Sequence, residues 1–112
     1  MLPKNKRVTK NKEFDLIFKT GRSAYVNLIG VKAVKNKLDK NRLGVLINNK
    51  VSKKAVERNR IKRIIKSVFK EKESAFNDRY DILVIALPAI KDSAREPIST
   101  AFNDAIKRLR LN

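Results

Sequence analysis

The side chains with the clearest chemical capacity lie in one basic stretch near the middle of the chain. Its nine basic residues are Lys50, Lys53, Lys54, Arg58, Arg60, Lys62, Arg63, Lys66 and Lys70, and its one carboxylate is Glu57. Ammonium and guanidinium groups bind phosphate oxygens through charge and through hydrogen bonds. A stretch with nine basic residues and one acidic residue therefore predicts a surface that binds a polyanion.

An apolar stripe runs through the same stretch at helical spacing. At about 100° per residue, its members share about one third of a helix: Ile61, Ile64, Ile65, Val68 and Phe69. The opposite side carries Asn59, Lys62, Arg63, Lys66 and Lys70, with Arg58 and Arg60 at the boundary. We expect a helix that begins near a candidate cap at Ser52 and ends near Lys72. A lysine-rich face that serves only solubility is the alternative, but solubility is served by mixed signs.

The overall composition agrees with a nucleic-acid partner. The chain has 112 residues, a formal net charge of +17 and a sequence pI near 10.6. This length is usual for one domain, so we expect a single RNA-binding domain over residues 1–112, with residues 1–10 as a basic mobile arm. Phosphate neutralisation explains such a charge most easily, and binding should therefore weaken steeply with salt.

The sequence lacks the usual residues of protein catalysis. It has no histidine and no cysteine, which removes the usual general base, the thiolate nucleophile and the usual zinc ligands. Its eleven carboxylates are scattered outside any metal-ligand motif, and three glycines do not form a phosphate-binding loop. We expect no catalytic residue and no metal site in the protein itself.

No stretch of the sequence has the character of a membrane span. The longest apolar run, from Ile82 to Ile90, is interrupted by Pro88 and is far shorter than the roughly 20 residues of a membrane helix. The basic N-terminus lacks the apolar region of a signal peptide. We expect a cytoplasmic protein.

Four segments have strand character: 22–26, 28–34, 42–48 and 81–87. The second and third alternate apolar and other residues and should form a hairpin. The fourth is continuously apolar, as in a buried central strand. The basic helix between the third and fourth strands predicts a crossover that joins a parallel pair.

Two further helices flank these segments. The first should be capped at Asn11 and stop at Gly21, and the last should start between Ser93 and Pro97. The order of elements is then α-β-β-β-α-β-α, which predicts an α+β sandwich with one mixed sheet.

The central motif resembles the signature helix of the bacterial ribonuclease P protein component. That family shows an Ala-Val-x-Arg-Asn-Arg-x-Lys-Arg pattern after a strand that begins Arg-x-Gly. Here the helix reads Ala55-Val56-Glu57-Arg58-Asn59-Arg60-Ile61-Lys62-Arg63, and the strand reads Arg42-Leu43-Gly44. The family's N-terminal pattern, a Phe before an apolar-Phe-Lys-x-Gly run, is matched by Phe14 and residues 17–21. The resemblance covers nearly the whole chain.

The resemblance implies a partner and a division of labour. The family's protein binds a large catalytic RNA and the 5′ leader of precursor tRNA, and the RNA with its bound Mg²⁺ removes the leader. The protein would thus be an accessory subunit of an endoribonuclease in tRNA 5′ maturation, with no obligate protein partner. The family also implies a ribosomal-protein S5 domain 2-like fold with a left-handed β-α-β crossover. The RNA-binding residues implied by position are Lys50, Arg58, Asn59, Arg60, Lys62, Arg63 and Lys66.

The resemblance also implies a leader cleft between the first helix and the open face of the sheet. Its residues here are Phe14, Phe18 and Lys32. Single strands bind by stacking on aromatic side chains beside basic groups. The family often has an aromatic residue at the position of Lys32, so phosphate attraction would replace stacking there. The alternative places Phe14 and Phe18, one turn apart and near Ile17, in the core.

The loop before the helix departs from the family. The usual Ser-Lys-Lys-x-Gly is replaced by residues 48–54, which hold no glycine and one extra residue, with Lys50 as the best match to the second lysine. Two other functions fit the composition: a general RNA-binding module such as a small ribosomal protein, and a membrane-surface or partner-helix protein. The ordered Arg-Asn-Arg motif favours ribonuclease P, and the strand content argues against the membrane alternative.

Overall fold

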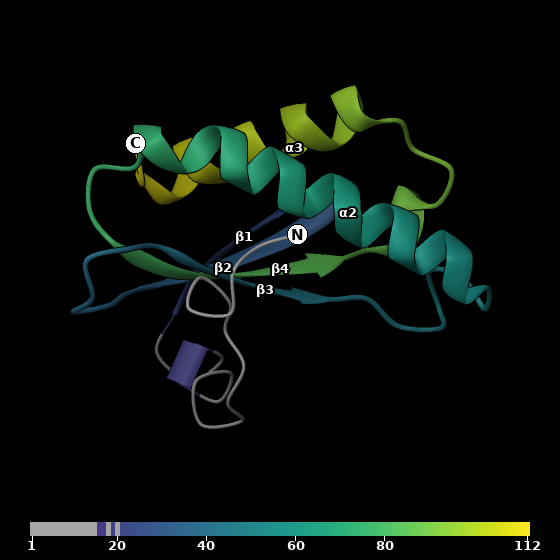
Figure 1. Cartoon of the computed structure of the whole chain (residues 1–112), viewed down its shortest axis with the longest axis horizontal. Helices are drawn as coiled ribbons and strands as arrows, with labels where there is room; N and C mark the ends of the chain where they lie inside the picture. The colour runs from purple at the N-terminus through teal and green to yellow at the C-terminus, as the bar shows by residue number, and fades with distance from the viewer. Residues whose placement is uncertain (1–15, 18, 20) are drawn as a thin grey trace.

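A computed structural model of the chain describes residues 16, 17, 19 and 21–112 (Figure 1). Its strands are β1 (Arg22–Val26), β2 (Ile29–Lys35), β3 (Arg42–Leu46) and β4 (Tyr80–Ala86). Its helices are α2 (Ala55–Lys72) and α3 (Arg95–Leu109), with short 3₁₀ turns at η2 (Glu73–Ala75) and η3 (Pro88–Ile90). Leu16, Ile17 and Lys19 are helical as well. The expected α+β class and element order are confirmed; the expected cap at Asn11 and the arm at 1–10 lie outside the described residues.

The four strands form one sheet in the order β1-β2-β4-β3. β2 is antiparallel to both β1 and β4, whereas β3 is parallel to β4. The expected parallel pair across α2 is therefore confirmed, but the expected hairpin between 28–34 and 42–48 is wrong. β4 lies between these two strands because its apolar side chains on both faces are best buried at the centre of the sheet. β2 instead forms its hairpin with β1, through a tight turn at residues 27–28.

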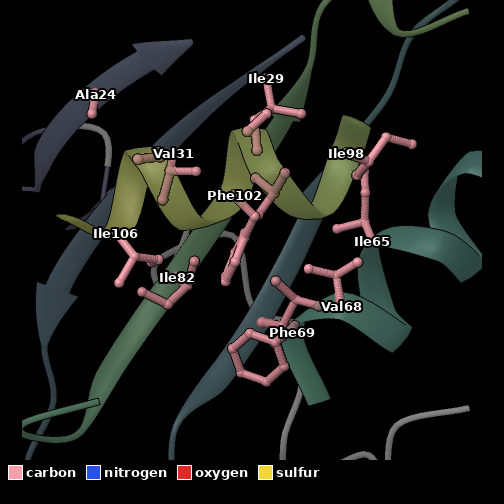
Figure 2. Close-up of a cluster of buried hydrophobic side chains, with 14 of the residues drawn as sticks. Ala24, Ile29, Val31, Ile65, Val68, Phe69, Ile82, Ile98, Phe102 and Ile106 are labelled. Carbon is pink, nitrogen blue, oxygen red and sulfur yellow. The ribbon is translucent and has the colours of Figure 1, made fainter. Parts of the chain in front are cut away.

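The main core lies between the sheet and the helices α2 and α3, which cover the same face (Figure 1). Phe69 and Phe102 are the largest of its fully buried side chains (Figure 2). The apolar stripe predicted for the basic helix faces this core: Ile61, Ile65, Val68 and Phe69 are buried, and Ile64 is partly buried. The helix therefore presents its opposite side outward.

The other side of the sheet, called here the open face, carries a smaller apolar cluster. Ile17 is fully buried against Leu83 of β4, with Val34 and Ile85 beside them. The helical segment stops at Gly21 as expected, and the Gly21 amide donates to the Ile17 carbonyl at 2.9 Å. A Cβ at Gly21 would lie 2.4 Å from that carbonyl oxygen. Close backbone approach, without a positive φ, thus requires glycine here.

The start of α2 differs from the expected one. The helix begins at Ala55, and Lys54 occupies the cap position without a side-chain hydrogen bond. The expected cap, Ser52, lies two residues too early: its hydroxyl oxygen accepts from the Lys54 amide at 3.2 Å within the loop. Ser52 and Val51 are both buried, so they anchor the loop. The first amides of α2 are consequently left without a side-chain cap.

Candidate nucleic-acid interface

The outward side of α2 forms an open groove of about 820 Å³. Its lining residues are Val56, Asn59, Lys62, Arg63, Lys66, Ser67 and Lys70. Helical spacing places four of the predicted RNA-binding residues here, because positions three and four apart share a face. Among the described residues, every charged side chain that lines the groove is cationic, and no carboxylate lines it. Val56, which is 80% exposed, is an apolar lining residue that sequence reasoning missed.

The two arginines of the Arg-Asn-Arg motif point elsewhere. Arg58 donates to the Ser52 carbonyl at 2.8 Å and so holds the loop before α2. Arg60 donates to the Glu57 carboxylate at 2.9 Å and to the Ser93 carbonyl at 3.0 Å. The sequence placed both at the boundary of the helix, and they are indeed half-buried. The structure brings neither into the groove with Asn59.

The contact between Arg60 and Glu57 also has an electrostatic consequence. The hydrogen bond from Arg60 lowers the pKa of Glu57 below its ordinary value, although partial burial opposes the shift. Glu57 in turn accepts from the amide of Asp92 at 3.4 Å. Asp92 has a φ of 65°, a conformation that few residues other than glycine adopt. Glu57 and Arg60 together therefore attach the loop before α3 to the first two turns of α2.

Lys50 lies in a separate hollow of about 420 Å³ beside the start of α2. Lys53, Lys54 and Lys91 line the same hollow, together with Glu57 and neighbouring loop residues. The loop needs no glycine, because among the described residues only Asp92 and Arg110 have a positive φ. The basic surface thus continues from the groove around the N-terminal end of α2.

The open face holds the one described residue of the expected leader cleft, Lys32; Phe14 and Phe18 lie outside the described residues. The register of the strands places Tyr25, Gly30, Ile85 and Leu46 in one line across all four strands, called here the apolar row. Tyr25 is 51% exposed and was missed by the sequence analysis. The sequence signal for such a residue was an aromatic side chain in one strand, Tyr25, that pairs with a glycine of the next strand, Gly30.

A buried ion pair lies at one end of the open face. The Arg42 guanidinium donates to both carboxylate oxygens of Asp81, at 2.8 Å and 2.6 Å. Asn36 donates to the same carboxylate at 2.9 Å. Asp81 is only 4% exposed, and its negative charge is matched by Arg42. The carboxylate therefore does not repel an anion that approaches the open face.

Within residues 16, 17, 19 and 21–112, no group of three or more carboxylate, histidine or cysteine side chains is placed to hold a metal ion. None of the helices in this part of the chain combines the length and the apolar character that a membrane crossing requires.

Comparison with known proteins gives a consistent result. The family model described as Ribonuclease P matches residues 2–110. The ribonuclease P protein component of Alkaliphilus metalliredigens is 32% identical over 96% of both chains. That of Clostridium kluyveri is 36% identical over 94% of this chain and 95% of its own length.

Solved structures agree in fold as well. The RNase P protein of Staphylococcus aureus has a TM-score of 0.86 at 34% identity, covering 95% of this chain and 96% of that one. The RNase P protein of Thermotoga maritima has a TM-score of 0.81 at 27% identity, covering 91% and 96%. This chain therefore shares its overall fold with these proteins.

Proposed function

The chain belongs to the ribonuclease P protein family, and on this premise we propose how it serves as the protein subunit of that tRNA-processing endoribonuclease. In this proposal the chain binds the catalytic RNA subunit and the 5′ leader of precursor tRNA, and it assists removal of the leader by the RNA. The observation that carries the proposal is the groove on α2: every charged side chain among its described lining residues is cationic.

The groove suits an RNA backbone for electrostatic reasons. Lys62 and Arg63 lie about one turn before Lys66 on the same helix, so the backbone positions of all three are set by α2 before RNA binds. Each phosphate that they neutralise releases condensed counterions, which favours binding at low salt. Asn59 adds a neutral amide that can donate to and accept from RNA. We assign these four residues to the RNA subunit.

Two separate surfaces allow two RNA segments to be bound at once. The groove lies on the outer side of α2, which covers one face of the sheet, while Lys32 lies on the open face. A leader strand on the open face would therefore not compete with the RNA subunit on α2. Arg58, Arg60 and Lys50 stay predicted RNA contacts, and the first two also hold loops beside the groove.

Catalysis is assigned to the RNA subunit in this proposal. Mg²⁺ ions held mainly by the RNA would supply the hydrolytic chemistry, and the protein would position the leader and the RNA backbone. The same proposal places the protein in the cytoplasm, where precursor tRNA is processed.

A reconstitution assay tests the proposal. The protein is mixed with ribonuclease P RNA and a precursor tRNA at low Mg²⁺, and leader removal is measured with and without protein. We expect stimulation by the protein and no cleavage by the protein alone. A protein that binds RNA tightly but gives no stimulation would support the general RNA-binding module instead, and cleavage without the RNA subunit would refute an RNA-based mechanism.

A further inference from the structure

The exposed ring of Tyr25 is the feature of the open face that the expected leader cleft does not explain. Tyr25 pairs with Gly30 of β2, Gly30 pairs with Ile85 of β4, and Ile85 pairs with Leu46 of β3. Strands lie about 4.8 Å apart, so this apolar row spans about 14 Å across the sheet. Tyr25 at one end and Leu46 at the other are both exposed large side chains. The row is thus an apolar strip on an otherwise strongly cationic protein.

Gly30 gives the Tyr25 ring its position. A Cβ at Gly30 would lie 2.4 Å and 2.6 Å from two carbons of the ring. The ring therefore lies directly on the glycine backbone, where any larger residue would displace it. Gly30 is buried in consequence, while half of the Tyr25 surface stays open to solvent. One face of the aromatic system is supported by the sheet and the rest is available for contact.

Lys32 supplies a cation at the same place. Its ammonium nitrogen lies 5.9 Å from the centroid of the Tyr25 ring, at the outer limit of a cation–π contact. A lysine side chain has a flexible four-carbon stem. The ammonium on this stem is long enough to reach a phosphate beside the ring. An aromatic face beside a basic group is the combination by which proteins bind single-stranded nucleic acid.

We propose that Tyr25 is a stacking platform for one base of the single-stranded leader RNA, and that Lys32 binds the phosphate next to that base. In this proposal the stacking aromatic residue lies on β1, whereas the family often has an aromatic residue on β2, at the position of Lys32. This inference rests on the proposed function, because it names the residues that bind the leader. The supporting observations are the half-exposed ring, its seat on Gly30 and its contact with Lys32.

The chain offers an internal control for a direct test. Its two tyrosines are Tyr25 and Tyr80, and Tyr80 is only 3% exposed. In protein with isotope-labelled tyrosine rings, bound to the ribonuclease P RNA, a precursor tRNA with a single-stranded leader is compared with mature tRNA. We expect the leader to shift the Tyr25 ring resonances upfield through ring currents, with Tyr80 unchanged. A Tyr25 ring that responds equally to both RNAs would overturn the assignment.

Substitutions give a second test that uses binding. Tyr25→Phe should retain the preference of the holoenzyme for precursor over mature tRNA, while Tyr25→Leu should lower it by about fivefold or more, the effect of one lost stacked base. Affinity for mature tRNA should stay the same in both variants, which reports intact folding. Lys32→Met, which keeps the stem, should reduce the salt dependence of precursor binding.

Different results would refute the proposed function and the role of Tyr25. Wild-type protein that gives the holoenzyme no preference for a leader would refute the proposed function. A wild-type preference for the leader that Tyr25→Leu leaves unchanged would refute the role of Tyr25 alone. If Tyr25→Leu fails to fold, the ring-resonance measurement on the wild-type protein still decides the question.

Discussion

The Arg60 guanidinium bridges Glu57 on its own helix, at 2.9 Å, and the carbonyl of Ser93, at 3.0 Å, in the loop before α3. Its Nε also donates to the Glu57 carboxylate, at 3.4 Å, so all three of its guanidinium nitrogens make contacts within the protein. A residue that sequence resemblance assigns to RNA therefore also connects two elements of the fold. Its substitution should affect the stability of the protein as well as the binding of RNA.

Replacement of Arg60 by alanine should lower the melting temperature. The Ser93 carbonyl loses a charged donor, and the loop before α3 loses one of its attachments to α2. We expect a decrease of about 4 °C for a domain of this size. Calorimetry of the free protein measures this. Lys62→Ala, on the outer face of the same helix, is the matched control and should melt within about 1 °C of wild type. Equal melting of all three proteins would show that the Arg60 contacts contribute nothing.

The Glu57–Arg60 contact should make stability depend on pH. Because the folded state lowers the pKa of Glu57, the contact stabilises the protein above the ordinary value near 4.5 and is lost as pH falls through the lowered pKa. Urea unfolding of wild type and Glu57→Gln should therefore differ in stability at pH 7, and the difference should shrink as the pH falls below about 4.5. A difference that stays constant over this range would contradict the assigned role of the carboxylate.

Removal of two groove cations should weaken the salt dependence of RNA binding. The double variant Lys62→Ala/Arg63→Ala should reduce the slope of log K against log salt by about 1.4 to 1.8, at roughly 0.7 to 0.9 per phosphate. Lys37→Ala/Lys107→Ala removes the same charge from exposed positions outside the groove. The control should change the slope much less, and an equal change in both would indicate a non-specific effect of net charge.

Disruption of the Arg42–Asp81 ion pair should be the most destabilising of these changes. Asp81→Ala removes the carboxylate that accepts two hydrogen bonds from Arg42, whose side chain is only 17% exposed. The loss should be about 3 kcal/mol in denaturant unfolding, the lower part of the range for a broken buried pair. Arg42→Met/Asp81→Leu should recover part of that stability, because neither charge then remains buried. A double variant with a lower free energy of unfolding than Asp81→Ala would indicate that the two charges are needed for the fold.

The sequence predicted local features well because local rules determine them. The period of 3.6 residues was enough to divide α2 into a buried stripe and the basic side that carries Asn59 and Lys62. Alternation along β2 correctly separated Val31 from Lys32.

Features that depend on distant partners were predicted less well. The pairing of β2 with β4 joins residues about fifty positions apart, and no pattern within either strand specifies it. Arg60 was placed at the edge of its helix, but its partner at Ser93 comes from another loop. Tyr25 is an exception, because its partner Gly30 is only five residues away in the sequence; it was overlooked because the contact depends on strand pairing across the turn at residues 27–28.

The central place of β4 has a consequence for how the chain folds during synthesis. β1, β2, β3 and α2 all precede β4 in the chain, yet β2 and β3 meet only through it. Until residue 86 has left the ribosome, the edges of β2 and β3 that pair with β4 stay unpaired, and the apolar stripe of α2 lacks its complete core. We expect such a chain to fold late and as one unit, since non-local strand pairing is slow. A fragment that ends before Tyr80 should accordingly show no cooperative unfolding transition.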